Sequence, residues 1–208
     1  MSAALGILRQ GGWVMFPIGL ASLLAVTIVI ERAIALRRRV VIDPRVLGII
    51  EDYSGEASAE RCLNACQHLR APFARVIEDI LKTRHLDLSQ IMETMNLTGR
   101  SQISVLERGL TVLEIIGNTG PLLGLLGTVL GMISMFNAVT LRGLGNPQVL
   151  SDGIAKALVT TVGGLCVAIP AVAFHSWYCR RVDDLAAEMQ DRATGFIFKM
   201  QSLRKSGR

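Results

Sequence analysis

Three long runs of this sequence contain no Asp, Glu, Lys or Arg, and they constrain the fold more than any other feature. The runs cover residues 11–30, 115–141 and 157–179. A helix of about 20 apolar residues is long enough to cross the roughly 30 Å hydrocarbon core of a bilayer. Because lipid offers no partners to backbone N–H and C=O groups, such a run must satisfy them internally, as a helix does. The sequence therefore predicts an all-α integral membrane protein with three transmembrane helices.

The first run could also be a secretory signal peptide. A signal peptide carries its positive charge before the apolar stretch and a small-residue cleavage site after it. Here only Arg9 precedes the run, whereas three arginines, Arg37 to Arg39, follow it. We therefore interpret the run as a membrane-spanning helix.

Basic residues flank the runs unevenly, and this asymmetry predicts the topology. Arg37 to Arg39 follow the first run, and Arg180 and Arg181 follow the third, while the opposite ends carry little positive charge. Since loops rich in Lys and Arg stay in the cytoplasm, we expect the N-terminus outside and the C-terminus inside. The same flanking residues account for the net charge of +5, so no nucleic-acid partner is expected.

This topology divides the chain into six segments. We expect an N-terminal segment with the first transmembrane helix in residues 1–36, a cytoplasmic helical domain in 37–111, the second transmembrane helix in 112–141, a short periplasmic loop in 142–153, the third transmembrane helix in 154–179 and a cytoplasmic C-terminal helix in 180–208.

The helices are expected to extend well beyond the bilayer. No proline separates residues 86–109 from the second run, and Asp87 or Ser89 suits a helix start, so we expect one continuous helix from about residue 88 to about residue 139. Asn146 and Pro147 suit the cap and first position of the third transmembrane helix. Beyond residue 179, apolar residues recur at helical spacing and predict that this helix continues; they are Val182, Leu185, Met189, Ala193 and Phe196.

Small residues recur on one face of the second and third runs. The second run has Gly117, Gly120, Gly124, Gly127 and Gly131 at spacings of three and four, with Thr128 on the same face. The third has Ala157, Thr161, Gly164, Ala168, Ala171 and His175 at similar spacings. Such faces allow transmembrane helices to pack closely. Alternatively, Thr128 and Thr161 present their hydroxyls to a shared polar space, and the sequence leaves both interpretations open.

Each of these two runs also contains a proline. Pro121 lies inside the second run and Pro170 inside the third. Proline removes one hydrogen bond of a helix and clashes with the preceding turn. We therefore expect a kink at each position.

The sequence lacks the common catalytic motifs of enzymes. The sequence contains no H-E-x-x-H, no P-loop and no G-x-S-x-G, so we expect neither an enzyme nor a cofactor. Cys62, Cys66 and His68 form only a loose C-x3-C-x-H, and no metal site is expected from it. No acid lies in the middle of any run, although proton-handling proteins place ionisable groups within the membrane. If the protein handles protons, the carrying acid belongs to another chain.

Two segments resemble a known family. Residues 120–132, GPLLGLLGTVLGM, and residues 153–165, GIAKALVTTVGGL, followed by AIPA at 168–171, resemble the second- and third-span signatures of the MotA/TolQ/ExbB proton-channel family, and most resemble its ExbB members. The resemblance implies a homo-oligomeric, pentameric ring in the bacterial inner membrane. The ring would surround a single-span partner of the ExbD or TolR kind, whose membrane Asp carries protons. The proton-motive force would then energise a TonB- or TolA-like protein for outer-membrane transport.

The resemblance also implies roles for particular residues. Thr128 and Thr161 match pore-lining threonines, and Pro121 and Pro170 match prolines of the spans. Positions of close helix approach match Gly120, Gly124, Gly127, Gly131 and Gly164. Lys156 departs from the pattern, because the best-known ExbB members have a glutamate there. Besides the ExbB-like motor we consider a TolQ-type motor for envelope integrity, a non-conducting membrane scaffold and a self-sufficient small-solute channel.

Overall fold

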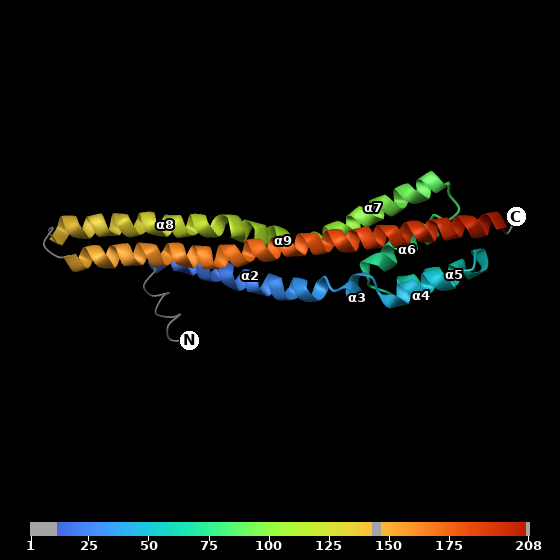
Figure 1. Cartoon of the computed structure of the whole chain (residues 1–208), viewed down its shortest axis with the longest axis horizontal. Helices are drawn as coiled ribbons and strands as arrows, with labels where there is room; N and C mark the ends of the chain where they lie inside the picture. The colour runs from blue at the N-terminus through green and yellow to red at the C-terminus, as the bar shows by residue number, and fades with distance from the viewer. Residues whose placement is uncertain (1–11, 143–146, 207–208) are drawn as a thin grey trace. The chain divides into compact units, whose positions relative to one another are not determined.

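The computed structural model describes residues 12–142 and 147–206, and all regular elements within them are helices (Figure 1). In chain order they are η1 Gly12–Val14, α2 Met15–Ala35, α3 Arg38–Val41, α4 Pro44–Asp52, α5 Glu56–Gln67, α6 Pro72–Lys82, α7 Leu88–Glu107, α8 Leu110–Arg142 and α9 Pro147–Ser206. The predicted all-helical fold is thereby confirmed for the described residues. The chain divides into two compact units, which are described separately.

Unit 1 comprises Met1–Glu31 and Gly109–Trp177, and its described helices are apolar on nearly every side. Candidate membrane spans occur at Gly12–Ala35, Leu110–Asn137 and within Gly153–Lys205. Only 22%, 22% and 28% of their most apolar windows are buried. Large apolar side chains such as Phe16, Leu122 and Ile169 are instead more than half exposed. A surface of this kind is suited to lipid rather than water, so the chain is a multi-pass membrane protein.

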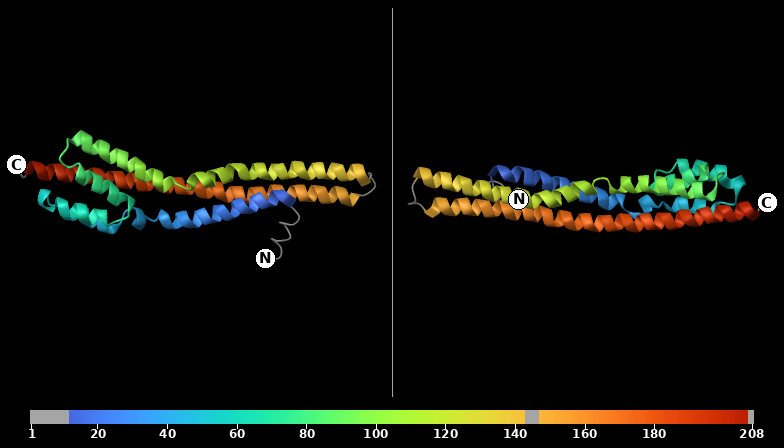
Figure 2. Two further views of the ribbon diagram at one scale, coloured as in Figure 1. Left: turned by 180° about the vertical axis from the view of Figure 1, so that it is seen from behind. Right: turned by 90° about the horizontal axis from the view of Figure 1, so that it is seen from above.

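Helices α8 and α9 lie side by side in unit 1 and run antiparallel (Figures 1 and 2). Helix α8 ends at Arg142 and α9 begins at Pro147, so Pro147 occupies the first helical position, as predicted. Asn146, expected as the cap of α9, and Arg9 lie outside the described residues.

The expectation of one continuous helix over residues 88–139 is wrong, because the chain breaks between α7 and α8. Arg108 leaves helical geometry with ψ 130°, and Gly109 has a φ of 90°, a conformation that glycine adopts without steric cost. The buried Arg32 donates from Nη1 to the carbonyl of Leu106 at 2.9 Å. This guanidinium satisfies a carbonyl at the end of α7 that helix continuation would otherwise satisfy.

Unit 2 comprises Arg32–Arg108 and Tyr178–Arg208 and has a conventional apolar core. Helix α6 contributes Phe73, Ala74, Ile77, Ile80 and Leu81, all fully buried. The predicted stripe on α9 is buried as well and consists of Val182, Leu185, Met189, Ala193 and Phe196. Asp87 caps α7, as expected, in a capping box with Gln90.

Polar contacts bind the last part of α9 to the rest of unit 2. Glu188 accepts from Arg38 Nε at 2.8 Å and from Arg192 Nε at 2.9 Å, and also pairs with Arg38 Nη2. The hydrogen bonds from Arg38, with the further bond from Arg192, lower the pKa of the Glu188 carboxyl to about 2. Lys199 Nζ donates to the carbonyls of Ile50 at 2.9 Å and Glu51 at 2.7 Å, at the C-terminal end of α4.

The two cysteines of α5 lie within unit 2. Cys62 and Cys66 are both buried, and burial raises the pKa of the Cys66 thiol to about 12. Since the thiolate is the form that binds metals and attacks electrophiles, this environment disfavours both kinds of chemistry at Cys66. His68 is exposed at the end of α5.

Candidate functional site

The small-residue faces of α8 and α9 face each other in unit 1. A Cβ added at Gly120 would lie 2.9 Å from Ala168 Cβ, and one added at Gly124 would lie 3.0 Å from Thr161 Cα. At Gly164 the added atom would lie 3.1 Å from Gly124 Cα. Carbon atoms are attracted best at about 3.5 to 4.0 Å, so these positions have no room for a methyl group. The backbones approach closely because the side chains between them are missing.

Two further glycines extend this contact toward the C-terminal end of α8 and the N-terminal end of α9. A Cβ at Gly131 would lie 3.0 Å from Ala157 Cβ, and one at Gly127 would overlap the Thr160 side chain. The structure therefore places Gly120, Gly124, Gly127, Gly131 and Gly164 along one seam between the two helices.

Thr161 links α9 to α8 at the middle of this seam. Its hydroxyl donates to the carbonyl of Gly124 at 3.3 Å. In an α-helix that carbonyl also accepts from the N–H four residues later, which here belongs to Thr128. The hydroxyl of Thr161 therefore lies within one turn of Thr128, so the two predicted residues are neighbours.

Thr128 and Thr161 remain partly exposed beside this seam. Thr128 donates its hydroxyl to the carbonyl of Leu125 at 2.7 Å, within its own helix. Both side chains are of intermediate burial. Each hydroxyl donates one hydrogen bond, and an oxygen of this type can also accept. Together they provide acceptor oxygens at the surface of two mostly apolar helical spans.

Thr160 is a site residue that the sequence pattern did not single out. It is 1% exposed, donates to the carbonyl of Ala157 at 2.7 Å and fills the space left by Gly127. The helical spacing assigned the small face to Thr161, and only the register of α8 against α9 brings the neighbouring Thr160 into the contact.

Both predicted prolines lie inside continuous helices. Pro121 is within α8 and Pro170 within α9, so neither ends its helix, and the expected kinks stay predictions. Pro170 lines an apolar cavity of about 170 Å³ between α2 and α9, together with Ala25 and Ala171.

Lys156 belongs to α9, and its side chain lies beside Gly12 of η1. Its Nζ would be 3.1 Å from a Cβ added at Gly12, and the φ of Gly12 is 69°. The long side chain therefore occupies the space beside this glycine. In the middle of the spans, the described residues offer hydroxyls and backbone carbonyls but no carboxylate. Such a site can accept and relay hydrogen bonds.

A profile of the MotA/TolQ/ExbB proton channel family matches residues 67–191, more than half of the 208 residues. The chain belongs to this family. The match contains the whole seam of α8 and α9 with both partly exposed threonines.

Individual relatives carry the same family name. An ExbB homolog of Methanothermobacter thermautotrophicus is 28% identical over 181 residues, which is 86% of this chain and 64% of the relative. An ExbB-like biopolymer transport protein of Synechocystis is 34% identical over 168 residues, with 78% and 65% covered. The biopolymer transport protein exbB1 of Vibrio cholerae is 30% identical over 169 residues, with 79% and 74% covered. The chain thus spans about two thirds of the length of the first two relatives.

Proposed function

We propose that this chain is the ring subunit of an ExbB-like motor driven by the proton-motive force in the bacterial inner membrane. The observation that carries the proposal is the family match over the α8–α9 seam, where Thr128 and Thr161 lie within one helical turn of each other. The similarity to ExbB-type biopolymer transport proteins favours the ExbB branch over the TolQ branch.

In this proposal the protein works as part of a larger assembly. Copies of the chain form a homopentameric ring with the N-terminus in the periplasm and the C-terminus in the cytoplasm, as the flanking arginines favour. A single-span partner of the ExbD or TolR kind supplies the acid that the spans of this chain lack. Proton transfer at that acid drives movement that a TonB- or TolA-like protein transmits to the outer membrane. The chain itself catalyses no covalent chemistry.

Thr128 and Thr161 have a specific role in the proposal. Their hydroxyls line the proton path and accept hydrogen bonds from the protonated acid of the partner. Each hydroxyl already donates to a backbone carbonyl, which leaves its oxygen oriented as an acceptor.

A non-conducting scaffold is the second candidate, and the same bonds favour it. Threonines of membrane helices commonly donate to carbonyls without any further role. In a scaffold Thr128 and Thr161 would serve helix packing alone.

Substitution of the threonines by valine separates the two candidates, because valine keeps the shape and removes the hydroxyl. Cells whose own copy is replaced by Thr128→Val or Thr161→Val are assayed for uptake that depends on the proton gradient, and ring assembly is checked by native mass spectrometry. The motor predicts that each variant assembles but loses about tenfold or more in uptake, the effect of removing about 1.4 kcal/mol of stabilisation at the proton path. Normal uptake by both variants would sink the proposal and leave the scaffold.

Two other threonines provide matched controls. Thr119 donates to the carbonyl of Ile115 at 2.7 Å and is exposed. It lies nine residues before Thr128, which at about 100° per residue puts it on the opposite side of α8. Thr160 is buried in the seam. Thr119→Val should leave uptake unchanged, and Thr160→Val reports what the loss of a packed hydroxyl does by itself.

A further inference from the structure

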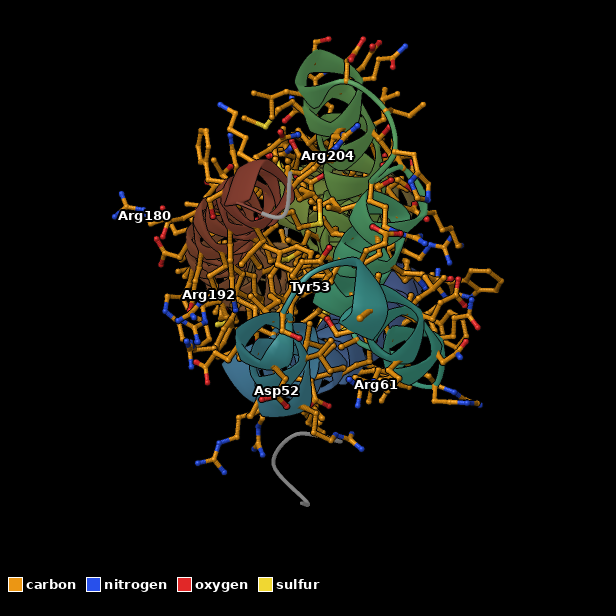
Figure 3. All side chains as sticks on the ribbon, turned by 90° about the vertical axis from the view of Figure 1, so that its right-hand side faces the viewer. Asp52, Tyr53, Arg61, Arg180, Arg192 and Arg204 are labelled. Carbon is orange, nitrogen blue, oxygen red and sulfur yellow. The ribbon has the colours of Figure 1, made fainter. Side chains whose placement is uncertain are left out.

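Unit 2 contains a cavity that has no part in the proposed motor mechanism. Its volume is about 460 Å³, within the range of roughly 300 to 1,000 Å³ usual for small-molecule sites. Three segments far apart in the sequence form it: the α4–α5 turn with the first turn of α5, the α6–α7 turn and the last turns of α9. Figure 3 looks onto the end of unit 2 that carries the C-terminus of α9 and marks Tyr53 and Arg204, two of its lining residues.

Cationic side chains reach the cavity from two of these segments. Arg84 is only 13% exposed at its side chain, and its Nη1 donates to the carbonyl of Leu81 at 3.0 Å, so the guanidinium is held in place. Arg204 and His85 also line the cavity. A positioned guanidinium presents a planar set of donors that matches the oxygens of phosphate or carboxylate groups.

The first turn of α5 adds backbone donors. Gly55, Glu56 and Ala57 line the cavity at the N-terminus of this 12-residue helix. Gly55 is the N-cap and has no side chain with which to cap the helix. The first N–H groups of a helix and its positive dipole end favour an anion at this position.

Tyr53 adds a neutral hydrogen-bond donor to the cavity. Its side chain is 5% exposed, its ring packs edge-on against Phe196 at a centroid distance of 5.2 Å, and it lines the cavity. No described residue hydrogen-bonds its hydroxyl, and no buried side-chain oxygen among the described residues lacks a partner, so this hydroxyl is open to the cavity. A hydroxyl at the open end of a buried ring can donate to a molecule in the cavity.

In the structure Arg84 is paired with a carboxylate of the chain itself. Glu56 accepts from Arg84 Nε at 2.7 Å, while its own side chain is 65% exposed. Glu60 lies 3.8 Å from Arg84 Nη2 and is 76% exposed. Because both carboxylates extend into solvent, either can move away when a stronger anion arrives. Ion pairs this exposed contribute little stability, so displacing them costs little.

We propose that this cavity, between α5, the α6–α7 turn and the end of α9, binds a small molecule through a phosphate group. Arg84 and Arg204 hold the phosphate oxygens, the amides of the first turn of α5 and the Tyr53 hydroxyl donate to them, and Glu56 competes with the ligand for Arg84. A phosphate fits better than a carboxylate, because donors converge from several directions and phosphate offers three acceptor oxygens.

Calorimetric titration of the detergent-solubilised full-length protein with inorganic pyrophosphate at low salt tests the proposal. We expect saturable binding that weakens as salt is added. Arg204→Gln should weaken binding about tenfold or more, the effect of losing one charge-assisted contact. Glu56→Gln should strengthen binding, because it removes the competing carboxylate, an effect that a purely structural ion pair would not produce. Arg61→Gln is the control, since Arg61 is an exposed arginine of the same helix α5 that does not line this cavity.

A second titration, with short-chain phosphatidic acid in the micelles, distinguishes a lipid headgroup from a soluble phosphate. Binding of either ligand supports the site only if the Arg204→Gln substitution abolishes that binding. Absence of saturable binding by wild type, or equal binding by the Arg204→Gln and Arg61→Gln variants, overturns the proposal. Arg204 lies in the last turn of α9, so its substitution leaves the core intact, and Tyr53→Phe offers a second variant that removes one hydroxyl only.

Discussion

Adding one methyl group at Gly124 tests how closely α8 and α9 approach in unit 1. In Gly124→Ala the new Cβ would lie 3.0 Å from Thr161 Cα and 3.2 Å from the carbonyl oxygens of Thr160 and Thr161. All three obstacles are backbone atoms, so no side-chain rotation relieves them, and α9 must move back by about 0.5 to 1 Å to restore ordinary contact distances. That movement also stretches the hydrogen bond from Thr161 to the Gly124 carbonyl.

The expected magnitude follows from two opposing effects. Overpacking by one methylene costs about 1 to 3 kcal/mol. Replacing glycine by alanine inside a helix returns about 0.5 to 1 kcal/mol, because alanine loses less conformational freedom. We therefore expect Gly124→Ala to lower the free energy of unfolding by about 1 to 2 kcal/mol.

Gly195→Ala is the matched control. Gly195 lies in α9 with nothing within 4 Å of its added Cβ, so only the conformational gain remains, and the variant should be stabilised by about 0.5 to 1 kcal/mol. Unfolding of both variants is followed in detergent by titration with SDS and by fluorescence of Trp13 and Trp177. If Gly124→Ala proves as stable as Gly195→Ala, the close backbone contact in the seam is refuted.

Two further predictions concern the polar contacts of unit 2. Because the Glu188 pKa lies at about 2 rather than near the usual 4.5, its ion pairs stabilise the fold above about pH 4.5 and lose that effect as pH falls toward 2. The difference in thermal midpoint between wild type and Glu188→Gln should therefore be present at pH 7 and vanish in acid. A difference that grows in acid would contradict the assigned pairing. The control is Asp184→Asn, which changes an exposed acid of the same helix. Lys199→Met removes the donor to the Ile50 and Glu51 carbonyls. It should lower the free energy of unfolding by about 1 to 3 kcal/mol and speed amide exchange in α4. The control Lys205→Met, at an exposed lysine, should leave that exchange unchanged, and unchanged exchange in Lys199→Met would show that the contact does not hold α4.

The break between α7 and α8 shows where sequence reasoning about helices fails. Gly109 lies in a long stretch without proline, and an isolated glycine is tolerated inside many helices at a cost of about 1 kcal/mol. The deciding contact comes from Arg32, whose partner Leu106 is 74 residues away in the sequence. A local pattern cannot reveal a capping group that folding brings in from another helix.

The site was predictable in its composition and less so in its detail. The glycine spacing of three and four places Gly120, Gly124 and Gly127 on one helix face, and that face lies in the seam. The choice between Thr160 and Thr161 as the buried residue depended on the register of α9 against α8, in which Thr160 meets Gly127. Helical spacing alone places two adjacent residues only about 100° apart, which does not decide which of them is covered.

The sequence by itself determined that this chain crosses a membrane with three helices and that α9 continues far past its apolar stretch. Both follow from interactions between near neighbours in the chain, namely backbone hydrogen bonds that lipid cannot replace and apolar residues that recur with the helical period. The tertiary structure alone decided the break at Gly109, the burial of Thr160 and the cavity around Tyr53. These features depend on groups that are distant along the chain. The spacing of residues within one helix carries no information about which distant segment will pack against that helix.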